Sequence, residues 1–202
     1  MLQFKRASDP EELEAIYRLR YEVYCLEKAY LPANQFKDGL EKDELDDHSV
    51  SFLSMDTDDG RELLGCFRLI LPSDHGFPCE HHFVLTERTP DPENTVEMSR
   101  LIVASKARKM WRYVLMGLSK EIYLFNRENH INYNYAVMDR PLISALQRLG
   151  LPFLIAGESA LYMGQTTPTI LCMKTLEEVL PHTNLWFYDY LQASREEQEA
   201  WF

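Results

Sequence analysis

The alternation of hydrophobic and polar residues predicts three strands in the first third of the chain. Residues 2–6 (LQFKR) form one short alternating segment, and residues 49–55 (SVSFLSM) and 62–71 (ELLGCFRLIL) form two longer ones. Asp58-Asp59-Gly60 lies between the two longer segments and has the composition of a hairpin turn. We therefore expect these two segments to pair as antiparallel strands.

Helical spacing of apolar residues predicts a helix between the first two strands. Ser8 is the expected capping residue, and Asp9-Pro10 with the two acids that follow is typical of a first helical turn. We expect this helix to run to about Cys25. Residues 27–47 and 72–94 carry turn formers and charges without periodicity, so we interpret both segments as long loops.

The second half of the chain alternates strands with helices. Residues 95–103 (TVEMSRLIV) have the composition of a buried strand, and a helix near 106–127 and the strand 133–138 (YNYAVM) follow. A further helix opens at Asp139 and ends at Gly150. The remaining predicted elements are two strands, PFLIA and TILCM, and a C-terminal helix, LWFYDYLQAS.

This order of elements predicts a mixed α/β (α+β) fold. The first half is expected to be largely antiparallel, and the strand–helix–strand unit in the middle is expected to be a parallel crossover. The pattern is typical of an N-acetyltransferase-like fold and of several other α+β folds. The order alone does not separate them.

Length and composition favour one globular domain over residues 1–202. Hydrophobic residues make up 46% of the chain and charged residues 26%, as in ordinary globular proteins. We expect no transmembrane segment, because no apolar run approaches about 20 residues. The first residues carry no targeting signal, and four scattered cysteines without a C-x-x-C pair suit a reducing compartment. We therefore expect a cytoplasmic protein without a nucleophilic cysteine.

The net charge of −11 argues against nucleic acid as a partner, but one segment is basic. SKARKMWR (105–112) contains four cations and no acid. It is either a solvated helix start or a focused attraction for a specific anion. Cations at the beginning of a helix oppose the helix dipole, which favours the second interpretation.

Two charges interrupt the predicted central strand, at Glu97 and Arg100. A charge in a buried strand costs several kcal/mol unless it is paired or faces a cleft. Other charged and aromatic residues precede them in a characteristic order. Arg20 and Tyr24 lie four residues apart, EKDELD (41–46) is acidic, and GCFR (65–68) ends in an arginine.

These motifs resemble those of the acyl-homoserine lactone synthases, a branch of the N-acetyltransferase-like (GNAT) superfamily. That family has an arginine and an aromatic residue four apart on its first helix, an E-x-D-x-x-D loop and a G-x-x-R strand. It also has a glutamate and an arginine three apart on its central strand. The match extends to about residue 105, and its specificity lies in the combination of motifs.

The lactone synthases carry a tryptophan where this chain has Tyr30, and that tryptophan helps to shape their adenosylmethionine site. The segment 20–53 and the later segment 155–168 (IAGESALYMGQTTP) instead resemble long-chain N-acyl amino acid synthases. They are particularly similar to the acyltransferases associated with PEP-CTERM/exosortase systems. The likeness implies a GNAT fold, with a mixed twisted sheet, a splayed central strand and helices on both faces. It also implies acyl transfer to the amine of an amino acid.

In this superfamily the central strand leaves its neighbour at a bulge. A bulge shifts the two-residue alternation by one, so that Glu97 and Arg100 share a cleft. Glu97 would then be the catalytic base that deprotonates the acceptor amine, directly or through a water. Arg100 would hold an acidic group, which is either a substrate carboxylate or one of Asp43 and Asp46. The alternative is a buried ion-pair network that only fixes the fold.

Arg20 and Arg68 have the same two interpretations. We expect one to pair with the acidic loop and the other to bind the carboxylate of the acceptor through its planar guanidinium. Asp43 and Asp46 orient or neutralise these arginines. The candidate substrate-binding residues are Arg20, Tyr24, Tyr30, Asp43, Asp46, Arg68 and Arg100.

The donor is expected to bind after the central strand. Relatives that use coenzyme A hold its pyrophosphate there in a glycine-containing loop, whereas ASKARK (104–109) has no glycine. The cations suit the phosphate of phosphopantetheine and the acidic surface of acyl carrier protein. We therefore expect acyl carrier protein rather than coenzyme A, and no permanently bound cofactor. The candidate donor-binding residues are Val103, Ser105, Lys106, Arg108, Lys109 and Arg112.

A long acyl chain needs an apolar wall, and no metal is expected. The residues that either line such a tunnel or belong to the core are Phe125, Tyr135, Phe153, Leu154, Leu161 and Tyr162. His81 and His82 beside Cys79 and Glu80 match no standard zinc spacing.

Three functions remain open at this point. The first is a long-chain N-acyl amino acid synthase, and the second is an acyl-homoserine lactone synthase that uses S-adenosylmethionine. The third is a non-catalytic protein of the same fold that binds acyl carrier protein or lipid. The sequence does not give the acceptor amino acid, the chain length or the oligomeric state.

Overall fold

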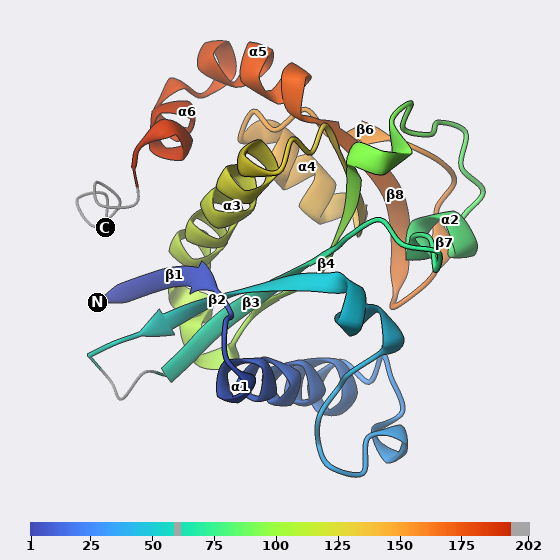
Figure 1. Ribbon diagram of the computed structural model, residues 1–202, viewed down its shortest axis with the longest axis vertical. Helices are drawn as coiled ribbons and strands as arrows, with labels where there is room; N and C mark the ends of the chain where they lie inside the picture. The colour runs from blue at the N-terminus through green and yellow to red at the C-terminus, as the bar shows by residue number, and fades with distance from the viewer. Residues whose placement is uncertain (59–61, 195–202) are drawn as a thin grey trace. The chain divides into compact units, whose positions relative to one another are not determined.

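The structure is a computed structural model that describes residues 1–58 and 62–194 (Figure 1). Its first half contains β1 (Leu2–Arg6), α1 (Pro10–Arg20), the π-helix η1 (Tyr21–Glu27), the 3-10 helices η2 (Ala33–Gln35) and η3 (Glu44–His48), β2 (Ser49–Asp56) and β3 (Glu62–Ile70). The middle contains α2 (Pro78–His82), η4 (Pro92–Asn94), β4 (Thr95–Val103), η5 (Ser105–Met110), α3 (Trp111–Glu128) and β5 (Tyr133–Met138). The last part contains α4 (Arg140–Arg148), β6 (Leu154–Ile155), β7 (Ala160–Leu161), β8 (Gln165–Cys172), α5 (Met173–Thr183) and α6 (Leu185–Gln192).

The predicted elements are largely confirmed. The strands β1, β4 and β5 have the predicted bounds, and β2 and β3 differ from prediction by one residue. Several details differ from the prediction. The cap of α1 is Asp9, whose side chain accepts the Glu12 N–H, and residues 21–25 continue as a π-helix. The structure adds α2 inside the predicted loop 72–94, and α5 was not predicted. The predicted turn Asp58-Asp59-Gly60 extends beyond the described residues.

The chain divides into two compact units, and neither is continuous in sequence. Among the described residues, unit 1 contains Met1–Leu69 and Ser99–Tyr123, and unit 2 contains Ile70–Met98 and residues 124–194. The strand β4 therefore contributes its last five residues to unit 1 and its first four to unit 2. The expectation of a single domain over residues 1–202 stays a prediction.

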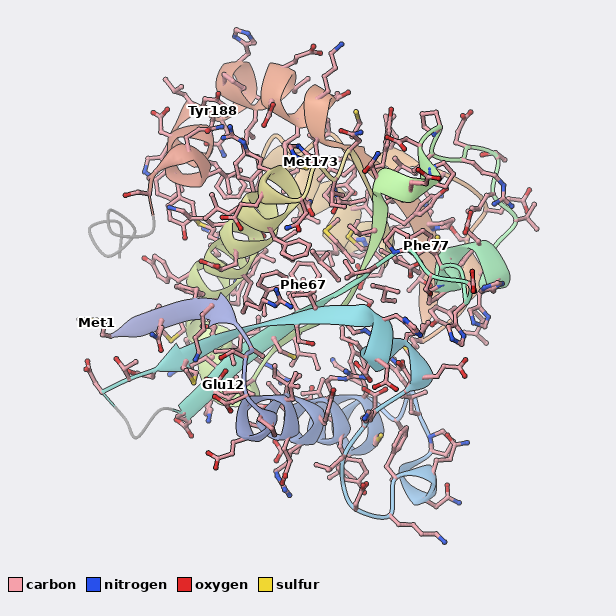
Figure 2. The ribbon with its side chains drawn as sticks, viewed as in Figure 1. Met1, Glu12, Phe67, Phe77, Met173 and Tyr188 are labelled. Atoms are coloured by element: carbon pink, nitrogen blue, oxygen red, sulfur yellow. The ribbon has the colours of Figure 1, made fainter. Side chains whose placement is uncertain are left out.

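Unit 1 is a sheet in the order β1-β2-β3-β4 with a helix on each face (Figure 1). The strands β1 and β2 are antiparallel. The helix α1 covers one face and the first part of α3 covers the other, so that Glu12 and Phe67 lie on opposite sides of the strands (Figure 2). The core under α1 consists of Ile16, Leu19, Leu53, Met55, Cys66, Ile102 and Ala104.

Two glycines let α3 approach the strands of unit 1. A Cβ on Gly65 would lie 2.6 Å from the Ile102 carbonyl oxygen and 2.7 Å from a Val114 methyl carbon. A Cβ on Gly117 would lie 2.2 Å from the Phe4 ring. All three distances are below van der Waals contact, so the glycine of the GCFR motif is required by packing rather than by chemistry.

Unit 2 contains the order β4-β5-β8-β6, with β7 paired to β8. The strands β4 and β5 are parallel, and their pairing covers Thr95 to Met98 only. The strand β8 is antiparallel to β5 and to β6. These orders give a mixed sheet of eight strands, in which β1 and β2 are antiparallel and the predicted parallel crossover from β4 to β5 is confirmed. Within the two described ranges, no helix is long and apolar enough to cross a membrane.

Candidate active site

Unit 1 brings three arginines and three carboxylates into one ion-pair network. Its members come from α1, the loop 41–46, β3 and β4, which are separated by up to 80 residues (20 to 100) in the sequence. The side chains that form the network are Arg20, Glu41, Asp43, Asp46, Arg68 and Arg100.

Glu41 is the central carboxylate of this network. Arg20 Nε donates to Glu41 Oε2, and Arg100 donates from Nε at 3.2 Å and 3.3 Å and from Nη2 at 2.9 Å. The Glu41 side chain is 1% exposed. Its backbone N–H donates to the Tyr17 carbonyl oxygen at 3.0 Å, which attaches the loop to the end of α1. A single buried carboxylate thus bridges two guanidinium groups.

Asp43 and Asp46 hold the other sides of the three guanidinium groups. Arg20 makes a two-bond contact with Asp46, at 2.6 Å and 3.1 Å. Arg68 Nη1 donates to Asp43 at 2.6 Å and to Asp46 at 3.0 Å. Arg100 Nη2 also donates to Asp43, at 2.9 Å. Both Arg20 and Arg68 therefore pair with the acidic loop, whereas the sequence predicted this for one of them.

The D-x-x-D spacing of the acidic loop has a structural cause. Asp43 is the cap of η3, and its side chain accepts the Leu45 N–H at 3.1 Å. The Asp46 side chain in turn accepts the Asp43 N–H at 2.8 Å. This reciprocal capping box holds the two carboxylates side by side through backbone hydrogen bonds that do not involve the arginines. The spacing of the two acids carried this signal in the sequence, but the capping box was not predicted.

The predicted irregularity of the central strand is present at Arg100, whose φ is 53°. Ser99 Oγ accepts a hydrogen bond from Arg68 Nε at 2.9 Å, and Arg100 binds Glu41 and Asp43. Consecutive residues of a regular strand point to opposite faces, but these two side chains join the same network. The backbone at Arg100 therefore shifts the alternation by one residue, as a bulge does. Glu97 and Arg100 belong to different units, so their sharing of one cleft stays a prediction.

The aromatic residues of the predicted substrate site lie beside the network. The Arg100 guanidinium lies over the Tyr24 ring, 5.4 Å from its centroid, and the Tyr24 and Tyr30 rings are 6.0 Å apart. Ala29, with a φ of 51°, turns the chain after η1, and the Tyr30 N–H donates to the Tyr24 carbonyl oxygen. All seven candidate substrate-binding residues thus lie in unit 1 and form one connected group.

The network is buried except at one carboxylate, which is partly exposed to solvent. Its three guanidinium groups and three carboxylates carry +3 and −3, so their formal charges sum to zero. The Asp43 side chain is 30% exposed, whereas the other members are almost fully buried. A small molecule that reaches the network would therefore meet the Asp43–Arg100 pair first.

Mutual pairing keeps the network ionised. Burial alone would raise the pKa of Asp46, but its hydrogen bonds and charge interactions with Arg20 outweigh this effect and lower the pKa to about 2. Burial likewise opposes ionisation of Glu41, and the charges of Arg100 and Arg20 outweigh it, so that the pKa of Glu41 is lowered. Burial raises the pKa of the Tyr24 hydroxyl to about 12, so Tyr24 stays protonated at neutral pH.

Glu97 lies in unit 2, on the first half of β4. Its side chain is 2% exposed, and Oε2 accepts the Cys79 N–H from the first turn of α2 at 2.9 Å. In the parallel register, Glu97 is opposite Tyr135 of β5, whose hydroxyl accepts the Thr89 N–H at 3.0 Å. A backbone donor thus fixes the direction of one oxygen of this buried carboxylate.

The cysteines of the chain are free thiols. Burial, followed by the neighbouring Glu97 carboxylate, raises the pKa of the Cys79 thiol. Burial likewise raises the pKa of Cys66 to about 12 and that of Cys25 above its usual value. Partial burial opposes ionisation of Cys172, but hydrogen bonds from the first turn of α5 outweigh it and lower the pKa of this thiol. Among the described residues, no group of three or more His, Cys, Asp or Glu side chains could hold a metal ion.

The predicted donor-binding residues lie at the end of β4, in η5 and at the start of α3, all in unit 1. Two of the four cations are already ion-paired, Lys106 with Glu62 and Arg108 with Glu27. Lys109 is exposed, and the exposed Arg112 lies 5.6 Å from the centroid of the Trp111 ring. The basic character of this segment is therefore strongest at Lys109 and Arg112.

The six residues proposed for a tunnel wall or the core do not share one environment. Phe125, Tyr135 and Phe153 are buried. Leu154 is 63% exposed and Leu161 is 84% exposed, because both lie on two-residue strands that leave their side chains in solvent. The prediction was wrong for these two residues. Tyr162 is half-buried and stacks on the His82 ring at 4.4 Å.

The chain is similar to known proteins in sequence and in fold. The family described as acetyltransferase (GNAT) domain matches residues 19–117, which include the whole ion-pair network. This match and the mixed eight-stranded sheet indicate the GNAT fold. No curated protein sequence matches the chain.

The solved structures with this fold include two kinds of acyl-transferring synthase. BjaI, a CoA-dependent acyl-homoserine lactone synthase solved with SAM and isopentyl-CoA, is 22% identical with a TM-score of 0.70, over 95% of this chain and 89% of BjaI. The acyl-homoserine lactone synthase LasI is 17% identical with a TM-score of 0.68, over 86% of this chain and 89% of LasI. FeeM, an N-acyl amino acid synthase from uncultured soil microbes, is 15% identical with a TM-score of 0.66, over 93% of this chain and 98% of FeeM. The GNAT fold expected from the sequence is confirmed.

Proposed function

We propose that the protein is an N-acyltransferase that moves a long-chain fatty acyl group from acyl carrier protein to the amine of an amino acid. The observation that carries this proposal is the buried, oriented carboxylate of Glu97 on the central strand of a GNAT acyltransferase. Glu97 takes a proton from the ammonium group of the acceptor, directly or through a water. The free amine then attacks the thioester carbon, a C–N bond forms, and the C–S bond breaks to release the phosphopantetheine thiol.

The charge balance of the network supports an amino acid as the acceptor. A sulfonium substrate such as S-adenosylmethionine carries a net positive charge, which a negative site would favour. The network is formally neutral, so it provides no such excess. Its open edge offers one guanidinium, Arg100, and one carboxylate, Asp43, in direct contact. A zwitterionic amino acid can exchange partners with such a pair, with its carboxylate on Arg100.

Arg20 and Arg68 have a supporting role in this proposal. Each is buried and held by the acidic loop, Arg20 through Glu41 and Asp46 and Arg68 through Asp43 and Asp46. They fix Asp46 and Asp43, which in turn fix Arg100. Tyr24 and Tyr30 form the aromatic side of the acceptor site, with Tyr30 more exposed than Tyr24.

The second candidate is an acyl-homoserine lactone synthase that uses S-adenosylmethionine. The observation that favours it is the likeness of the fold to BjaI and LasI. Tyr30 argues against it, since a tyrosine offers a smaller aromatic surface to an adenosine group than a tryptophan does. A non-catalytic protein of the same fold is the third candidate, and it leaves the oriented Glu97 without a role.

Offering both donors and both acceptors to the purified protein separates the three candidates. We expect long-chain acyl carrier protein and a mixture of free amino acids to give N-acyl amino acids, detected by mass spectrometry. Long-chain acyl-CoA should be the poorer donor. Release of methylthioadenosine together with an acyl-lactone would replace our proposal by the second candidate, and no product from any combination would leave the third.

We also expect charge reversal in the donor segment to weaken the use of acyl carrier protein. Lys109→Glu with Arg112→Glu should raise the KM for acyl carrier protein severalfold, since exposed cations attract an acidic partner over about 8 Å at physiological ionic strength. The wild-type KM should rise with salt for the same reason. The matched control reverses Arg148 and Lys174, two exposed cations of unit 2, and so makes the same change in net charge. Equal KM values for the two double variants would show that Lys109 and Arg112 are only solvated.

A further inference from the structure

Unit 1 contains a groove that the proposed acceptor site does not use. The groove has a volume of about 680 Å³ and lies between one face of α1 and η1 and the segment Ala104–Lys106. Its apolar lining includes Leu19, Val23 and Leu63. Charged and polar side chains stand among them, with Glu27 on one side and Ser105 and Lys106 on the other.

The Glu27 carboxylate is bound by three donors at this groove. Ser105 Oγ donates to Oε2 at 3.1 Å, Arg108 Nη2 donates to Oε1, and Lys28 Nζ lies 3.6 Å from Oε1. Ser105 and Arg108 are 78 and 81 residues away from Glu27 in the sequence. The hydrogen bond from Arg108, helped by Ser105 and Lys28, lowers the pKa of Glu27, so the carboxylate is ionised at neutral pH.

This set of donors is one that also suits a phosphate. A guanidinium, an ammonium and a hydroxyl converge on two oxygens of one anion, and phosphate is bound in proteins by the same groups. Ser105 and Arg108 also belong to the segment proposed above to bind the phosphate of the donor. The Glu27 carboxylate therefore occupies hydrogen-bonding positions that a phosphate would need.

We propose that Glu27 is an internal competitor of the donor phosphate, which displaces it from Ser105 and Arg108 when phosphopantetheine enters the groove. This inference rests on the proposed function, because it takes the donor to be an acylated phosphopantetheine. In the free protein the Glu27 carboxylate holds Arg108 in place. An anion binds to Arg108 only if it displaces this carboxylate, which weakens the binding of anions. The apolar lining of the groove then takes the uncharged part of the pantetheine chain.

The exposure of the pair limits the size of the effect. The Arg108 side chain is 52% exposed, and ion pairs in such positions contribute little net free energy. Displacing the Glu27 carboxylate therefore costs little free energy. We expect loss of its charge to strengthen the binding of phosphopantetheine by about 5-fold.

Glu27→Gln tests this inference with a side chain of nearly the same size. Titration calorimetry with 4′-phosphopantetheine should show binding about 5-fold tighter than in wild type, whereas pantetheine, which lacks the phosphate, should bind equally to both proteins. Glu11→Gln is the matched control, because Glu11 is an exposed carboxylate of unit 1 that does not line the groove, and its loss changes the net charge equally. It should bind phosphopantetheine as wild type does. Adding Arg108→Gln to Glu27→Gln should remove the gain.

Unchanged or weaker binding of phosphopantetheine by folded Glu27→Gln, or no binding by any variant, would overturn the inference. Glu27 would then only connect η1 to η5 through its hydrogen bonds to Ser105 and Arg108. An equal gain in Glu11→Gln would also overturn it, since only the net charge would then matter. The titration does not depend on acyl transfer. If the protein forms N-acyl amino acids but Glu27→Gln does not bind phosphopantetheine more tightly, the inference is wrong and the proposed function stands. If Glu27→Gln binds phosphopantetheine more tightly but the protein forms no product, the inference stands and the proposed function is wrong.

Discussion

Glu97→Gln is expected to lower the turnover number by about 100-fold or more, the usual consequence of losing a general base. The amide cannot take a proton from the acceptor ammonium at neutral pH. The fold should be retained, because the carbonyl oxygen of glutamine can still accept the Cys79 N–H that now binds Glu97 Oε2. The effect should fall on kcat rather than on the KM of either substrate, since the exchanged atoms are those that handle the proton.

The measurement is steady-state kinetics with acyl carrier protein and the preferred amino acid, together with thermal unfolding of each variant. Glu80→Gln is the control, because Glu80 follows Cys79 in α2 and binds Arg88 at the surface. It should keep wild-type turnover. If Glu97→Gln instead lowers the melting temperature and leaves kcat intact, Glu97 belongs to a structural network and another group is the base.

Most of the fold followed from the hydrophobic pattern. The strands β1, β4 and β5 had clear periodicity and clear ends, and their bounds were predicted correctly. The helix α1 was found because proline and acids mark its beginning, but the cap was placed one residue early, at Ser8 instead of Asp9. The Ser8 N–H in fact donates to the Glu12 side chain, so Ser8 lies just outside the helix.

The elements that the hydrophobic pattern did not predict correctly are short or are defined by tertiary contacts. The helix α2 has five residues, too few for a helical period to be visible. The strand β6 (Leu154–Ile155) lies inside the predicted strand PFLIA but has only two residues, and the two-residue strand β7 (Ala160–Leu161) was not predicted. Edge strands of this length are defined by pairing with β8 and not by hydrophobicity.

The candidate substrate-binding residues were chosen from motifs, and the structure places all of them in unit 1. Glu41 was quoted in the acidic motif but was not selected as a site residue, although it binds two arginines. Ser99 was missed, because a serine in a strand gives no signal of its own until Arg68 is known to reach it. The contact between Glu97 and Cys79 was also beyond the sequence, since it joins α2 to β4 across a loop without periodicity.

Glu41→Gln is expected to lower the free energy of unfolding by about 3–5 kcal/mol, the usual result of removing one partner from a buried ion pair. The side chain is buried, and its loss of charge leaves Arg20 and Arg100 to share the charges of Asp43 and Asp46. Both guanidinium groups would then be buried with too few counter-charges, and neither can lose its proton.

Urea unfolding followed by circular dichroism measures this change, with Asp47→Asn as the matched control. Asp47 is in the same loop and also carries one negative charge, but its side chain is 77% exposed and lies 3.8 Å from Lys42. Its replacement should cost about 0–1 kcal/mol, because water screens an exposed pair. A loss below about 1 kcal/mol in Glu41→Gln would mean that the buried guanidinium groups find other partners. The neutral, closed network would then not be what holds the acidic loop against β3 and β4.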